Sequence, residues 1–121
     1  MHGQVPSVSW DEIVDRLRAF ERYPNIWPTA TANLRMVSAM RNDARFAEVG
    51  RNVSHISVVV WRRDRPNRIT MVWSEPDGIA WCGSTGFVID RWPSAGLIDS
   101  PERSVVPEHD VIATLITFLA V

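Results

Sequence analysis

Residues 53–61 read VSHISVVVW, and this stretch decides the fold because it changes the period of the hydrophobic pattern. Before it, apolar residues recur every three or four positions, as in a helix, whereas here the pattern alternates with a period of two. The stretch is rich in β-branched residues, which favour the pleated backbone of a strand. Ile56, Val58 and Val60 would share one face, and the more polar residues between them the other. We therefore expect one β-strand over 53–61.

Further strands are expected C-terminal to it. Residues 68–75, RITMVWSE, alternate in the same way, and residues 79–82 begin a third strand. Between these two lies Glu75-Pro76-Asp77-Gly78, which suits a type I turn with proline second and glycine last. Residues 87–89 either continue the third strand past a break or form a fourth. Because tight turns join neighbouring strands, the pattern predicts an antiparallel meander of three to four strands.

The N-terminal residues carry a helical pattern instead. Ser9 and Glu12 have the spacing of a capping box, and an apolar stripe follows until Pro24 ends the helix. Residues 25–31 are expected to be a connector, and residues 32–49 to be helical, with Asp43 as an N-cap and Gly50 as the stop. Alternation within 32–49 leaves open one helix, two helices or part strand.

A C-terminal helix is expected from Pro107 onward, after an irregular stretch over 91–106. Residues 111–121, VIATLITFLAV, have almost no polar side, yet this run is too short to span a bilayer, which needs about 20 residues. A helix that is apolar all round must be covered by a sheet, by other helices or by a second copy of the chain. A homodimer through the Val111–Val121 helix is therefore one alternative.

Taken together, these elements predict one domain over residues 1–121. Its expected class is α+β: an antiparallel three- to four-stranded β-meander packed against two N-terminal helices and a C-terminal helix, in a two-layer sandwich. A chain of 121 residues is long enough for one independent core.

The amino-acid composition argues against some classes of function. All 13 cationic side chains are arginine, the net charge is −1 and the pI is about 6.3. This balance argues against a general nucleic-acid or membrane binder, which usually has a strong basic excess. The lack of lysine is typical of a GC-rich genome, so we expect a bacterial source. One cysteine and no visible signal peptide favour a reducing compartment, and we expect a cytoplasmic protein.

The sequence offers no motif for catalysis, metal binding or a cofactor. Its histidines and single cysteine lack metal-ligand spacing, so we expect no metal, no cofactor and no catalytic residue. One alternative is a small-molecule-binding domain or small enzyme, with a pocket between sheet and helices lined by His55, Ser57 and Cys82.

The sharpest local feature is a run of arginines after the first strand. Arg62, Arg63, Arg65 and Arg68 surround a single acid, Asp64. Such a segment suits a carboxylate- or phosphate-bearing partner, and arginine and tryptophan are enriched in binding hot spots. The expected function is therefore a non-enzymatic domain that docks on another protein as an inhibitor, immunity-type protein or adaptor. The expected partner-binding residues are Trp61, Arg62, Arg63, Arg65, Arg68 and Trp81.

Overall fold

The structure is a computed structural model that describes residues 6–64, 68–73, 86–92 and 101–121. The described residues form three α-helices and five β-strands, with short 3-10 helices between some of them. In chain order the elements are α1 (Trp10–Arg18), η1 (Ala19–Arg22), α2 (Trp27–Arg41), η2 (Ala44–Phe46), β1 (Gly50–Ser54), β2 (Ser57–Trp61), β3 (Arg68–Trp73), β4 (Gly86–Trp92), β5 (Glu102–Pro107), η4 (Glu108–Asp110) and α3 (Val111–Leu119). The α+β class expected from the sequence is confirmed.

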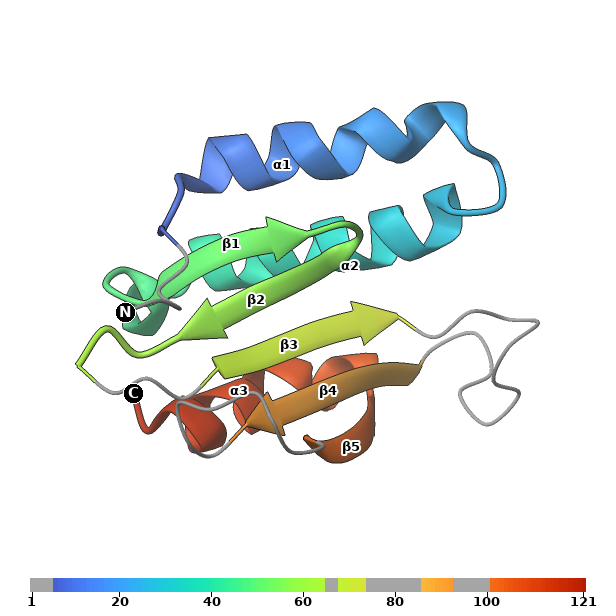
Figure 1. The fold of residues 1–121 in the computed structure, drawn as a ribbon. Coiled ribbons are helices and arrows are strands. Elements are labelled where there is room, and N and C mark those ends of the chain that lie inside the picture. Colours follow the sequence, from blue (N-terminus) through green and yellow to red (C-terminus); the bar gives the residue numbers. More distant parts are fainter. Residues whose placement is uncertain (1–5, 65–67, 74–85, 93–100) are drawn as a thin grey trace.

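The five strands form a sheet in the order β1-β2-β3-β4-β5, and each neighbouring pair is antiparallel (Figure 1). The expected count of three to four strands is therefore wrong. The single strand expected over 53–61 is two strands, β1 and β2, paired from Gly50↔Trp61 to Ser54↔Ser57. In addition, β5 occupies the end of the stretch 91–106 that was expected to be irregular, and it includes Pro107, which was expected to open the last helix.

The turn between β1 and β2 consists of His55 and Ile56. His55 has a positive φ of 55°, a conformation usually taken by glycine or asparagine. The turn is held from the helix layer, because Asn33 on α2 donates its side-chain amide to the carbonyl of Ile56 at 2.6 Å. Since neither turn residue is a typical turn former, the sequence pattern reads continuously through the hairpin.

Replacing His55 with glycine should raise the free energy of unfolding by about 0.5–1 kcal/mol, because glycine adopts a positive φ without strain. Ser54→Gly is the matched control, since it places glycine in the adjacent β1 position, where glycine weakens a strand. Urea unfolding monitored by circular dichroism measures both changes. Equal destabilisation by the two substitutions would contradict the prediction.

The edge strand β5 is stabilised by contacts with its partner β4 more than by a hydrophobic pattern of its own. Its residues are mostly exposed or half-buried. Two ion pairs join it to β4: Arg103 binds Asp90 at 2.8 Å and 2.9 Å, and Arg91 lies 3.5 Å from Glu102. These four residues are opposite one another in the register. Cross-strand pairs of opposite charge stabilise a sheet, so β5 is fixed by contacts that its own hydrophobic pattern does not reveal.

The helix boundaries also differ from expectation. Residues 25–31 are not simply a connector, because α2 begins at Trp27 with Pro28 in its first turn, where proline is tolerated. In 32–49 the α-helix continues only to Arg41. The N-cap expected at Asp43 is confirmed: its carboxylate accepts from the backbone N–H of Arg45 at 3.0 Å and opens η2. Gly50 begins β1 and does not end a helix.

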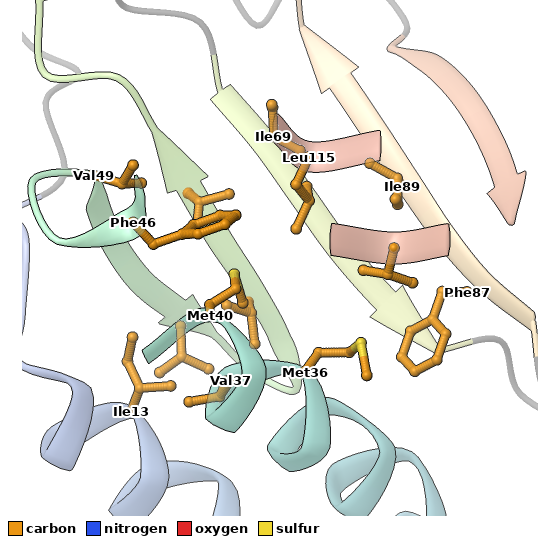
Figure 2. Packing of buried hydrophobic residues seen from close by; sticks show 14 of the residues in the cluster. Ile13, Met36, Val37, Met40, Phe46, Val49, Ile69, Phe87, Ile89 and Leu115 are labelled. Atoms are coloured by element: carbon orange, nitrogen blue, oxygen red, sulfur yellow. The ribbon is translucent and has the colours of Figure 1, made fainter. Parts of the chain in front are cut away.

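The core lies between one face of the sheet and the helices (Figure 2). Val58 and Val60 on β2 are fully buried there, and the register places Ile69 beside Val60. In Figure 1, α2 and α3 lie behind the sheet; α2 contacts β2, β3 and both other helices. The buried cluster comprises Ile13, Leu17, Ala32, Met36, Val37, Met40, Phe46, Val49, Val53, Val58, Val60, Ile69, Phe87, Ile89, Val111, Leu115 and Leu119.

The apolar helix α3 is covered along one side. Val111, Leu115 and Leu119 are buried in the core, whereas Ala113 and Thr117 face solvent. The core therefore accounts for one stripe of this helix, and the homodimer through Val111–Val121 stays a prediction. Among the described residues, no helix combines the length and apolarity that a membrane crossing requires.

Candidate functional site

Arg62, the first of the predicted binding arginines, is occupied within the protein. Its guanidinium binds Asp64 with two hydrogen bonds, of 2.8 Å and 2.6 Å. This carboxylate raises the pKa of Arg62 above its ordinary value. The same side chain also lies 3.4 Å from the backbone carbonyls of Leu119 and Ala120, at the end of α3. Cations at a helix C-terminus satisfy its last carbonyls, so Arg62 joins the β2 end to α3.

Arg63 is placed differently. It is exposed, and its Nη2 donates to the hydroxyl of Ser7 at 3.3 Å. Arg68 begins β3, but its side chain lies outside the described residues, as do Arg65 and Trp81 entirely. Of the predicted partner-binding residues, the structure therefore describes the side chains of Trp61, Arg62 and Arg63.

Trp61 is half-buried and packs across its neighbouring strand. It pairs with Gly50, and a Cβ added to Gly50 would lie 2.3 Å from two atoms of the Trp61 ring. Because side chains alternate along a strand, Trp61 lies on the face of β2 opposite the buried Val60. The ring therefore covers the start of β1 from the side of the sheet away from the core.

Two of the three alternative pocket residues, His55 and Ser57, lie on the β1–β2 hairpin. His55 is exposed in the turn. Ser57 is half-buried, and its position next to Val58 puts it on the face of β2 away from the core cluster. Cys82 lies outside the described residues, so the pocket stays a prediction.

Arg51 is a residue that the sequence pattern did not single out. Its guanidinium lies over the ring of Trp10, 4.3 Å from the centroid, in a cation–π arrangement. Its Nη1 donates to the carbonyl of Val49 at 2.9 Å. Its Nε is buried and has no hydrogen-bond partner within the part of the chain that the structure describes. A buried donor left in this way costs free energy, and it would gain from an acceptor.

Ser7 brings Arg51 and Arg63 together. Its hydroxyl accepts from the backbone N–H of Arg51 at 3.1 Å and from the side chain of Arg63 at 3.3 Å. Ser7 is itself held at the β1 edge, because the neighbouring Val8 donates its N–H to the Arg51 carbonyl at 2.9 Å. We call the surface formed by Ser7, Trp10, Arg51 and Arg63 the Arg51–Arg63 surface.

Three segments that are distant in sequence build this surface. Residues 6–8 lie along the outer edge of β1, where Asn52 donates its side-chain amide to the carbonyl of Pro6 at 2.7 Å. The antiparallel pairing then places the start of β1 beside the end of β2. Figure 1 shows this N-terminal segment, the start of β1 and the end of β2 at the same end of the sheet.

The local charge at this surface is positive. Burial lowers the pKa of Arg51, and the like charge of Arg63 lowers it further. Glu48 acts in the opposite direction, but its effect is smaller than that of Arg63. The two guanidinium groups therefore repel each other without full compensation. An anion bound between them would relieve that repulsion.

Most other arginines have a carboxylate partner within 4 Å, which sets Arg51 and Arg63 apart. Among the described residues, the arginine–carboxylate pairs are Arg16–Glu12, Arg35–Glu108, Arg41–Asp11, Arg45–Asp43, Arg62–Asp64, Arg91–Glu102 and Arg103–Asp90. In that same set, neither Arg51 nor Arg63 forms an ion pair with an acidic side chain. Arg18 and Arg22 also have none, but both are exposed near the far end of α1.

No sequence signal could have found this arrangement. Arg51 follows the glycine that was expected to end a helix, and Trp10 belongs to the apolar stripe of α1. The two arginines are joined only through Ser7 and the strand pairing. Their proximity is a tertiary property.

The described residues contain no group of three or more His, Cys, Asp or Glu side chains arranged to hold a metal ion. The chain matches no protein-family model, and neither a curated protein nor a solved structure matches it.

Proposed function

We propose that this protein is a non-enzymatic interaction domain that docks on a partner protein through the Arg51–Arg63 surface. One observation supports it most strongly: the Arg63 side chain and the Arg51 backbone bind the same Ser7 hydroxyl, and neither arginine has a carboxylate partner among the described residues. Most of the other described arginines pair with acids. A cation pair without an acid is a feature that a complementary partner would complete.

Arg51 is also suited to binding because it is already positioned. The Trp10 ring and the Val49 carbonyl fix its guanidinium, so less side-chain entropy is lost when a ligand binds. Tryptophan and arginine are the residues most enriched at binding hot spots. Trp61 lies at the same end of the β1–β2 pair but on the opposite face of the sheet from the Arg51 side chain, so the binding role expected for Trp61 is not part of this surface.

The proposal includes inhibitor, immunity-type and adaptor roles, because all of these act by docking. We place the partner in the cytoplasm, since one cysteine in 121 residues is typical of proteins from reducing compartments. A partner class of nucleic acid fits less well, because the chain carries a net charge of −1.

Replacing Arg63 with glutamate should abolish or strongly reduce partner binding. The reversed charge would pair with Arg51 inside the protein and repel an acidic partner. Affinity capture from a lysate of the source organism, comparing the variant with the unmodified chain, identifies the proteins that are lost. Binding of the identified, purified partner should then weaken at least about tenfold.

Arg22→Glu is the matched control, because it makes the same charge change at an exposed arginine without an ion pair among the described residues. Arg22 lies 12 residues from Trp10, which corresponds to about 18 Å along a helix. Unchanged thermal unfolding of both variants would show that the fold is intact. Equal capture of every partner by Arg63→Glu and the unmodified chain would refute docking through this surface.

A further inference from the structure

We infer that the ligand of the Arg51–Arg63 surface is a side-chain carboxylate in an acidic segment of the partner protein. This inference rests on the proposed docking function and specifies its chemistry. It follows from which donors are still available, how they are held, and how much positive charge the surface offers.

The donors that remain at this surface are guanidinium N–H groups. Arg51 uses Nη1 on the Val49 carbonyl, and Arg63 uses Nη2 on Ser7. Within the described residues, the Nη2 of Arg51 and the Nε and Nη1 of Arg63 make no hydrogen bond. Guanidinium groups bind planar carboxylates with paired, charge-assisted hydrogen bonds. The Arg63 guanidinium at the Ser7 hydroxyl and the guanidinium of Arg51, whose backbone N–H binds the same hydroxyl, therefore offer several donors to an anion.

The amount of positive charge favours one carboxylate over a nucleic-acid backbone. The neighbouring Arg62 is neutralised by Asp64, and Glu48 is close enough to affect the pKa of Arg51. Among the described residues, the surface therefore presents the charge of two arginines, partly offset by Glu48, and not a continuous basic stripe. Nucleic-acid binding gains its affinity from many phosphate contacts at once. The two positive charges of Arg51 and Arg63 instead correspond to the charge of one or two carboxylates.

The test is an NMR titration of the full ¹⁵N-labelled chain with a hexaglutamate peptide. A hexaglutamine peptide of equal length, inorganic phosphate and a hexathymidylate oligonucleotide serve as comparison ligands. Hexaglutamate should shift the backbone amides of Ser7 and Arg51, and hexaglutamine should not. Arg63→Gln should weaken hexaglutamate binding about tenfold, whereas Arg22→Gln should change it less than about twofold.

Three results would overturn the inference. Hexaglutamine could shift the same amides, Arg22→Gln could weaken hexaglutamate binding as much as Arg63→Gln, or phosphate or hexathymidylate could bind this surface more tightly than hexaglutamate does. The last result would identify a phosphate ligand.

The NMR titration tests the carboxylate ligand and the capture experiment tests docking, so a negative result in one does not decide the other. If Arg63→Glu loses a protein partner but hexaglutamate does not bind, docking stands and the carboxylate chemistry is wrong. If hexaglutamate binds but no protein is lost from the variant, the anion site stands and docking through it is wrong.

Discussion

Replacing Phe46 with alanine should lower the free energy of unfolding by about 3–5 kcal/mol, the usual cost of removing a fully buried aromatic side chain. Phe46 has 0% of its surface exposed and lies in η2, the short helix between α2 and the sheet. Figure 2 shows its ring between Val49 and Met40, facing the sheet. Without the ring, a cavity would open where the helices meet β2.

Phe20→Ala is the matched control, because it removes the same side chain from a half-buried position. Phe20 contacts Tyr23 with ring centroids 6.3 Å apart, and it is not part of the buried cluster. We expect it to cost about 1–2 kcal/mol, since less area is buried. Urea unfolding of both variants gives the comparison. Similar costs for the two would show that the core is not centred on Phe46.

Gly50→Ala should destabilise the protein by about 1–3 kcal/mol, the range observed when an extra methyl group is forced into a packed site. The methyl group would lie 2.3 Å from the Trp61 ring, so the ring or the strand must shift. Gly50 does not have a positive φ, so the backbone itself accepts alanine. The cost therefore arises from the neighbouring ring and not from the backbone conformation.

A double-mutant cycle tests that cause. In the Trp61→Ala background, Gly50→Ala should cost about 0 kcal/mol or slightly stabilise, because alanine restricts the unfolded chain more than glycine does. Chemical unfolding of the unmodified chain, both single variants and the double variant gives the coupling energy. An equal cost in both backgrounds would mean that Trp61 is not what excludes a side chain at Gly50.

The start of α1 shows which contacts can be predicted from the local sequence pattern. The cap expected at Ser9 is present, with its hydroxyl accepting from the Glu12 N–H at 3.1 Å. The other half of the capping box is replaced, because the Glu12 carboxylate binds Arg16 one turn later at 2.6 Å. Both outcomes involve residues within four positions of each other, where sequence spacing and spatial distance nearly coincide.

The β-hairpin shows where local pattern stops being sufficient. Residues 53–61 have the composition of a strand throughout, and nothing in their sequence marks His55 as a turn residue. The turn is selected by a contact from outside, the hydrogen bond that buried Asn33 donates to Ile56. The pairing of β5 with β4 likewise depends on charges about a dozen residues apart.

The candidate site also combines features that the sequence predicts with features that only the fold determines. The sequence marked Trp61, Arg62 and Arg63 as neighbours in one basic segment, and the net charge of −1 argued against a general nucleic-acid binder. The fold then separated them: Arg62 binds Asp64 and the end of α3, whereas Arg63 binds the Ser7 hydroxyl, which also accepts from the backbone of Arg51.

By itself, the sequence determined the α+β class, the N-caps at Ser9 and Asp43 and which faces of the elements are apolar, because these depend on the period and spacing of nearby residues. Only the tertiary structure decided which arginines are neutralised and which stay available. That distinction depends on side chains brought together from the N-terminal segment, β1 and the end of β2. Electrostatic and hydrogen-bond energies depend on distance in space, which a one-dimensional pattern does not contain.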